Sequence, residues 1–359
     1  MTPFGRKRGL SLALSLNILL IFSTAFQKQS WLYPNSHHAS ISRQRLLLLF
    51  SNAANEEDLV ASGTKIDVNQ TTTSGPSAVR SQKPFPTDSN ELQMISFYKF
   101  EPISDPSGCR DSLFESLKEI PGLRGTIYLA HKGINAQMAI PLDSLDMFMQ
   151  LVSTNLPFDP FIDDDRDNTL NLGDVVSIST PTFDRLVVRT RDYVLRDGIG
   201  QDLDWSDAGP ELDAQEWHSD LMSISSDSSS TSSLILDCRN MYESEEGTFV
   251  GATPLQTNTF QESWSKLDHM TKDHPKEKPL YIFCTGGIRC VKVGAYLKQQ
   301  LGFDNVKRLK HGIIGYQQWL ADNENNNEMN GSVWEGENFL FDKRRFEEKE
   351  PQEDNKTSD

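Results

Sequence analysis

The stretch from Tyr281 to Cys290 (YIFCTGGIRC) constrains the fold of this chain more than any other. An apolar, β-prone run, Pro279–Phe283, ends directly at Cys284, and two glycines and an arginine follow. The next residues, Val291–Leu301, predict a helix that ends at Gly302. The stretch therefore predicts a strand, a tight loop and the start of a helix, which is an α/β arrangement.

The loop has the composition of a nucleophilic cysteine site. Amide groups of a tight loop at a helix N-terminus can point at one bound group, and the helix end adds positive potential. We therefore expect Cys284 to have a depressed pKa and to act as a catalytic thiolate, with Arg289 as a catalytic fixed charge that holds the loop or the substrate. The predicted active-site loop between these two residues comprises Thr285, Gly286, Gly287 and Ile288. The alternative is a buried cysteine at a strand end, which is common.

The length of this loop distinguishes two chemistries. Cysteine phosphatases resemble this pattern but have five residues between cysteine and arginine, whereas four lie between Cys284 and Arg289. The smaller ring suits a sulfur atom better than a phosphate, and the six-residue loop resembles the active site of the rhodanese family. The resemblance implies a central parallel sheet flanked by helices.

Further blocks extend the rhodanese resemblance. The short apolar strand Leu234–Asp237 precedes Arg239, and Gly247–Ala252 is similar to a segment that follows it in that family. The Asp237 and Arg239 pair is either catalytic or a structural charge network beneath the loop. His311 stands where the family usually has glycine.

The region before this domain has a different pattern. Strand candidates lie at 94–100, 125–130, 134–140, 175–179 and 186–195, and helix candidates at 111–120 and 144–154. Up to 179 they follow the order β-α-β-β-α-β, and the strand at 186–195 comes after them. This order predicts a ferredoxin-like α+β plait.

Three segments resemble the tRNA uridine hydroxylase family, namely Phe97–Phe100, Leu123–Ala130 and Lys132–Asn135, and Ser332–Asp342 is similar to its segment after the rhodanese domain. The resemblance implies oxygen-dependent 5-hydroxylation of the wobble uridine of tRNA, with molecular oxygen as co-substrate and tRNA as partner. No other cofactor is evident, and no metal site is expected because the chain has no C-x-x-C pair. Lys132 and Ala136 depart from the family's usual residues.

The sequence predicts five parts. These are a targeting leader at 1–55 (a signal peptide at about 1–25 plus a transit peptide), a disordered linker at 56–91, a ferredoxin-like domain at 92–197, a rhodanese domain at 198–345 with a Ser-rich insertion at 223–233, and a charged disordered tail at 346–359. The leader contains basic but no acidic residues and resembles the bipartite plastid leader of algae with secondary plastids, so we expect a plastid location and no membrane association of the mature form. The alternative is the secretory pathway.

The net charge of the chain restricts how it can bind RNA. The formal net charge is −16, so RNA contacts need local basic patches. Lys292, Lys307, Arg308 and Lys310 are one candidate set, and Arg185, Arg189, Arg191 and Arg196 form a second basic stretch. The alternative is that both sets only line solvent-exposed faces and do not contact RNA.

Two questions about the thiols stay open. Cys290 is either a resolving thiol or a packed helix residue. The alternative function is a sulfurtransferase that forms a persulfide on Cys284 and passes its sulfur from a donor to a small thiol or a sulfur carrier.

Overall fold

The computed structural model describes residues 77–81, 87–161, 170–200, 202–226, 233–323 and 332–346. All of them belong to one unit of the chain, Thr73–Asp359. The predicted leader, most of the predicted linker, positions 227–232 of the Ser-rich insertion and residues 347–359 of the tail lie outside the described residues. Among the described residues, no helix has the length and apolar character needed to cross a membrane.

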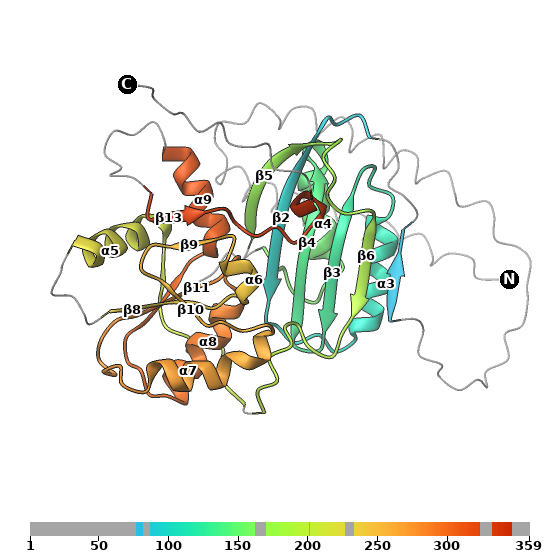
Figure 1. The fold of residues 1–359 in the computed structure, drawn as a ribbon. Helices are drawn as coiled ribbons and strands as arrows, with labels where there is room; N and C mark the ends of the chain where they lie inside the picture. The colour runs from blue at the N-terminus through green and yellow to red at the C-terminus, as the bar shows by residue number, and fades with distance from the viewer. Residues whose placement is uncertain are drawn as a thin grey trace, which may run out of the picture. The chain divides into compact units, whose positions relative to one another are not determined.

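The N-terminal domain is built on a six-stranded sheet with the strand order β1-β6-β3-β4-β2-β5 (Figure 1). Its strands are β1 (Ala78–Arg80), β2 (Glu91–Lys99), β3 (Arg124–Ala130), β4 (Gly133–Pro141), β5 (Asn171–Ser177) and β6 (Leu186–Thr190). Its helices are α3 (Pro106–Leu117) and α4 (Leu145–Thr154), with the 3-10 turn η1 (Leu142–Ser144) before α4.

The order of elements confirms the predicted ferredoxin-like plait. The elements β2-α3-β3-β4-α4-β5 give the four antiparallel strands β3-β4-β2-β5 of the plait. β6 adds to this sheet parallel to β3, and β1 pairs antiparallel with β6. The structure differs here from the sequence prediction, because β1 lies inside the stretch predicted to be a disordered linker. Its backbone groups pair with an otherwise open sheet edge, which composition alone does not reveal.

Local chemistry explains where the first helix begins. The Asp105 side chain accepts a hydrogen bond of 2.9 Å from the Gly108 amide, and Pro106 occupies the first turn. Leu113 and Leu117 are then buried one helical turn apart, facing the sheet. They pack with alternate residues of β2, β3, β4 and β6, so α3 and α4 cover the same face of the sheet. Among the described residues, no helix of the N-terminal domain lies on the opposite face, which we call the helix-free face.

The C-terminal domain has a five-stranded parallel sheet with the order β10-β8-β11-β12-β7. Its strands are β7 (Glu211–Leu212), β8 (Leu234–Asp237), β10 (Thr253–Pro254), β11 (Leu280–Phe283) and β12 (Val306–Leu309). Its helices are α5 (Ala214–Ser226), α6 (Met241–Ser244), η2 (Phe260–Glu262), α7 (Ser263–Thr271), α8 (Ile288–Gln299) and α9 (Gly312–Asn323). This arrangement confirms the predicted rhodanese fold class.

The central strand β11 is buried along its whole length. Leu280 and Ile282 pack in one hydrophobic cluster with α7 and α8, whereas Tyr281 and Phe283 pack in another with α5 and α9. A strand covered on both faces reads as a continuous apolar run, which is why the sequence predicts it well.

The segment after α9 contacts both domains. β13 (Trp334–Gly336) pairs antiparallel with β9 (Gly247–Phe249) of the rhodanese domain. Further on, in η3 (Lys343–Phe346), the Lys343 amide donates to the Thr182 carbonyl and the Arg344 guanidinium pairs with Asp174 of β5. The segment that resembles the hydroxylase family, Ser332–Asp342, therefore pairs with the rhodanese domain, and η3 directly after it contacts the N-terminal sheet.

Candidate active site

Cys284 is the residue that follows β11, and the loop 284–287 leads directly into α8. The loop is held from the side of α9, where the amides of Ile313 and Ile314 donate to the carbonyls of Cys284 and Thr285 at 3.0 and 3.1 Å. Gly312 permits this contact, because a Cβ there would lie 2.3 Å from the Cys284 carbonyl oxygen and its φ is +59°. Among the described residues, the amides of 285–289 have no backbone acceptor, so they are available to an anionic group.

Arg289 fixes the loop rather than facing its open side. Its Nη1 and Nη2 donate to the Glu243 carboxylate at 2.6 and 2.7 Å, and Nη2 also contacts the Thr285 hydroxyl at 3.1 Å. Arg289 is 8% exposed and Glu243 is fully buried. Burial alone would raise the pKa of Glu243, but the charge and hydrogen bonds of Arg289 lower it below its ordinary value. Of the two roles considered for Arg289, the geometry supports holding the loop.

The Asp237 and Arg239 pair is a structural network. Both side chains are fully buried, the Arg239 Nη2 lies 2.6 Å from Asp237, and it also donates to the Gly247 carbonyl. The Arg239 guanidinium lies 5.4 Å from the centre of the Trp334 ring. The pair therefore joins β8, β9 and β13, and it does not reach the open side of the Cys284 loop.

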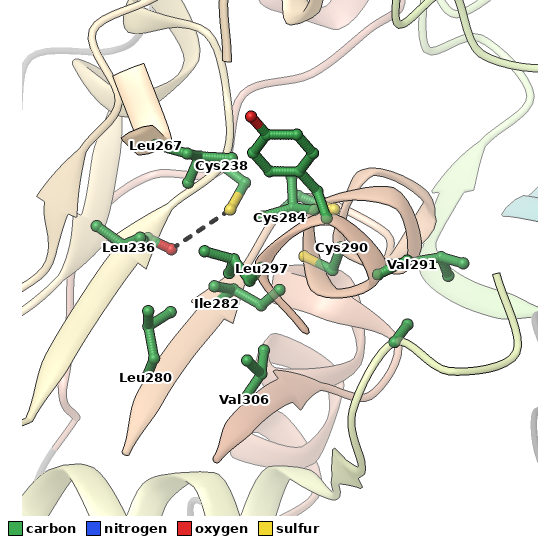
Figure 2. Packing of buried hydrophobic residues seen from close by; sticks show 14 of the residues in the cluster. Leu236, Cys238, Leu267, Leu280, Ile282, Cys284, Cys290, Val291, Leu297 and Val306 are labelled. Carbon is green, nitrogen blue, oxygen red and sulfur yellow. Dashed lines mark hydrogen bonds between the residues drawn. The ribbon is translucent and has the colours of Figure 1, made fainter. Parts of the chain in front are cut away.

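Three thiols meet beneath the loop. Cys238, Cys284 and Cys290 are buried and free, and their side chains turn toward one another (Figure 2). Burial raises the pKa of Cys284 well above its ordinary value, and the thiol of Cys290 adds to this, while Arg289 acts in the opposite direction. The predicted depressed pKa of Cys284 is therefore wrong for this structure, because complete desolvation outweighs the loop and helix potential.

The cover over the loop comes from the N-terminal domain. The Asn171 Nδ2 donates to the Gly286 carbonyl and to the Ser96 hydroxyl, both at 3.1 Å. A Cβ on Gly287 would lie 3.0 Å from the Tyr98 hydroxyl. Cys284 is 0% exposed because these side chains close the loop from above.

His311 belongs to the same cover. It precedes α9 with a φ of +58°, a conformation that favours the glycine expected at this position. Its Nδ1 lies 3.0 Å from the Asn171 Oδ1, so it orients the amide that contacts the loop. The histidine that replaces the expected glycine therefore contacts a residue of the N-terminal domain, Asn171.

The first candidate set of RNA contacts does not form a free basic surface. Lys292 pairs with Asp197 and Arg308 with Glu211, and both cations are buried. Lys307 pairs with Asp220 at 2.7 Å, and Lys310 is half-buried without an ion pair among the described residues. The structure thus contradicts the prediction for Lys292 and Arg308, because their charges are neutralised inside the fold.

Three residues near the loop were missed by sequence reasoning. Glu243 is not among the predicted site residues, and Tyr98 and Asn171 lie more than a hundred positions before Cys284. The signal that can find Glu243 is its place three residues after Asn240, since the two form a capping box at the start of α6. No cluster of His, Cys, Asp or Glu in the described part of the chain could hold a metal ion.

Known protein families match both domains. The family described as UPF0176 acylphosphatase like domain matches residues 92–194, and the family described as Rhodanese-like domain matches residues 218–321. The two matches correspond to the two sheets of the structure.

Relatives that match this chain over both domains are named tRNA uridine(34) hydroxylase. A tRNA uridine(34) hydroxylase of Legionella pneumophila (strain Corby) is 33% identical over 255 residues, which is 71% of this chain and 89% of the relative. The chain covers less of two enterobacterial proteins of that name: 66% of the one from Escherichia fergusonii, at 34% identity over 70% of this chain, and 68% of the one from Salmonella arizonae, at 33% identity over 72% of this chain. Because the similarity includes most of the Legionella protein, the chain belongs to the tRNA uridine(34) hydroxylase family.

Proposed function

We propose that this protein hydroxylates the wobble uridine of tRNA at C5, with Cys284 as the reacting residue. The observation that carries the proposal is that polar side chains of the N-terminal domain complete the Cys284 loop. Asn171 bonds to Gly286, and Tyr98 lies against Gly287. A site shared by both domains fits a family defined by both domains, and it supplies groups that a rhodanese domain alone lacks.

The groups around Cys284 are suited to a pyrimidine. Uracil presents two carbonyl acceptors and one N–H donor, and the cover contains an amide, two hydroxyls and an imidazole: Asn171, Ser96, Tyr98 and His311. Once a base displaces the contact to Gly286, the Asn171 Nδ2 has one donor free for the base edge, while its Oδ1 stays bonded to His311. The amides of 285–289 provide further donors.

Thiol addition explains how C5 becomes reactive. Addition of the Cys284 thiolate to C6 of uracil gives C5 the character of an enolate carbon, which bonds to molecular oxygen as a C5 hydroperoxide. Two equivalents of an external thiol then reduce the O–O bond, which leaves a hydroxyl on C5 and yields water and a disulfide. Loss of the C5 proton together with the C6–sulfur bond releases 5-hydroxyuridine and regenerates the Cys284 thiolate. The thiol must lose its proton for this step, and its raised pKa opposes that in the closed structure. We therefore include an opening of the cover in the proposal, since it both admits the base and hydrates the thiol.

The alternative function is sulfur transfer through a Cys284 persulfide. It is supported by the rhodanese-like domain at 218–321 and by the six-residue loop. It assigns no role to Asn171, Ser96 or Tyr98, which is why we place it second.

A reaction with purified components separates the two functions. The full chain is incubated with a tRNA that carries uridine at position 34 and with a small thiol as electron donor, in air or without oxygen, and nucleosides are quantified by mass spectrometry. The proposal expects 5-hydroxyuridine in air only, and none with Cys284→Ala. Thiosulfate-to-thiol transfer by a chain that leaves uridine unmodified would contradict it and favour the alternative.

We also propose that the protein acts in a plastid. The support is the leader at 1–55, which contains an apolar run and basic residues but no acidic residue. A fusion of residues 1–55 to a fluorescent protein tests this, and accumulation in the secretory pathway would contradict it.

A further inference from the structure

The helix-free face of the N-terminal sheet carries two rows of polar side chains that lead to the Cys284 loop. One row is Tyr98, Asn135, Tyr128 and Arg189, which are register neighbours across β2, β4, β3 and β6. The next row is Asn171, Ser96, Gln137 and Thr126. Because Tyr98, Asn171 and Ser96 also cover the loop, this face is continuous with the candidate active site.

The arginines of this face differ from the cations of the rhodanese domain. Among the described residues, Arg124, Arg185, Arg189 and Arg191 form no ion pair with a carboxylate, whereas Lys292 and Arg308 are paired. The Nε atoms of Arg124 and Arg189 are buried without a hydrogen-bond partner. In a chain with a net charge of −16, unneutralised arginines gathered on one surface are complementary to an anionic partner.

A pocket at one end of this face has unsatisfied polar groups of its own. It has a volume of about 290 Å³ and is lined by Arg124, Thr182, Arg185 and Lys343, with Asp184 as the one carboxylate. Asp184 is already paired with Lys343. Thr182 is 1% exposed and its hydroxyl has no partner, and burial lowers the pKa of the Arg124 guanidinium. The Arg124 Nη2 already donates to the Ile178 carbonyl at 2.7 Å, but its Nε has no partner. A phosphate group would supply acceptors for the Arg124 guanidinium and a partner for the Thr182 hydroxyl.

Aromatic side chains accompany the arginines. The Arg191 guanidinium lies 4.4 Å above the centre of the Tyr128 ring, and Tyr193, two residues further on, is 56% exposed. Aromatic rings and guanidinium planes on an open sheet are surfaces on which unstacked RNA bases stack. This combination favours single-stranded RNA over a protein partner.

We propose that this helix-free face is the surface that holds the tRNA, with one backbone phosphate in the pocket of Arg124, Thr182 and Arg185 and further phosphates beside Arg189 and Arg191. This inference rests on the proposed function, because it assigns a binding surface to the tRNA substrate of that function. Arg124 and Tyr128 are ~13 Å apart along β3, and Tyr128 and Tyr98 are ~10 Å apart across two strand spacings. One RNA stem-loop can therefore contact the pocket while its loop reaches Cys284.

Binding measurements with the full chain test the surface. Affinity for a uridine-34 tRNA is measured by fluorescence anisotropy over a range of salt concentrations, for Arg189→Gln/Arg191→Gln and for Arg185→Gln. The matched control is Lys272→Gln/Lys278→Gln, which removes two exposed charges from the rhodanese domain. We expect the arginine pair to weaken binding on the order of tenfold and to reduce the slope of log K against log salt by ~1.4–1.8, whereas the control changes neither.

The outcomes separate this inference from the proposed function. If Arg189→Gln/Arg191→Gln and the lysine control bind tRNA with equal affinity and equal salt slope, and both have unchanged unfolding midpoints, the helix-free face does not hold the tRNA. This conclusion would stand even if the wild type hydroxylates tRNA. Loss of binding confined to the arginine variants supports the surface even if no 5-hydroxyuridine forms, in which case only the proposed function fails. A wild-type chain that does not bind tRNA overturns both.

Discussion

The substitution Glu243→Gln probes how the loop is held. The Glu243 carboxylate is fully buried and receives two hydrogen bonds from Arg289, at 2.6 and 2.7 Å, and one from the Asn240 amide at 3.1 Å. The amide side chain keeps the size but removes the charge, so the Arg289 guanidinium stays buried without a counterion. Breaking a buried ion pair in this way costs about 3–5 kcal/mol. We expect urea unfolding followed by tryptophan fluorescence to show a loss of that size at neutral pH.

The pH dependence supplies a second test of the same pair. The folded-state pKa of Glu243 is lowered, so its contribution to stability is complete above the ordinary carboxylate pKa and is lost as the pH falls through the folded value. The stability difference between wild type and Glu243→Gln should therefore narrow below about pH 4.

A matched control is Glu115→Gln, whose partner Lys118 lies three residues on at the surface of the N-terminal domain. Its unfolding midpoint should remain close to that of wild type, because solvent screens an exposed pair. A loss below about 1 kcal/mol for Glu243→Gln, or a difference that does not change with pH, would refute the assignment of this carboxylate as the counterion that holds the loop.

Three further predictions concern the loop and its cover. Asn171→Ala should raise the rate at which iodoacetamide alkylates Cys284 in the native chain, as measured by mass spectrometry, and an unchanged rate would show that the amide does not close the site. Since burial raises the pKa of Cys284 well above its ordinary value, alkylation of the wild type should still accelerate at a pH at which an exposed thiol is already fully ionised. Gly312→Ala should abolish activity, because its Cβ would lie 2.3 Å from the Cys284 carbonyl oxygen, whereas Gly302→Ala, also at positive φ but with nothing within 4 Å, should keep it; equal activities of the two would contradict the crowding. Cys290→Ala should cost about 1 kcal/mol of stability and leave hydroxylation intact, as expected for a packed residue, while a loss of turnover would identify a resolving thiol.

The parts of the fold that follow local rules could be predicted from the sequence. Leu234–Asp237 was predicted with its observed bounds, and β11 within one residue, because buried parallel strands are short continuous apolar runs. The loop after β11 was recognised from residue types alone. Two helix starts were less accurate, because α3 begins at Pro106 and α8 at Ile288, several residues before the predicted positions. The Asp105 side chain caps α3, whereas α8 begins directly at the glycine loop, with Gly287 as its N-cap and no side-chain cap; apolar periodicity reveals neither start.

The electrostatics of the site could not be predicted, because they depend on which side chains meet in three dimensions. A cysteine at a helix N-terminus suggests a low pKa, but the cover from Tyr98 and Asn171 removes the solvent on which that depends. Likewise, Lys292 appears basic in the sequence, yet Asp197 neutralises it from almost a hundred residues away. Arg189 of the second basic stretch, in contrast, forms no ion pair with a carboxylate of the described residues, and its Nε is buried without a hydrogen-bond partner.

Analysis of wobble nucleosides in total cellular tRNA decides whether this protein hydroxylates uridine through Cys284. Cells that lack this gene are complemented with the wild-type chain, with Cys284→Ala, or with Cys109→Ala as a control at a free cysteine of the other domain. If Cys284 carries the reaction, 5-hydroxyuridine and its derivatives should disappear without the gene. They should return with the wild-type chain and with Cys109→Ala, but not with Cys284→Ala. Unchanged nucleosides in the absence of the gene, or full restoration by Cys284→Ala, would contradict the proposed function.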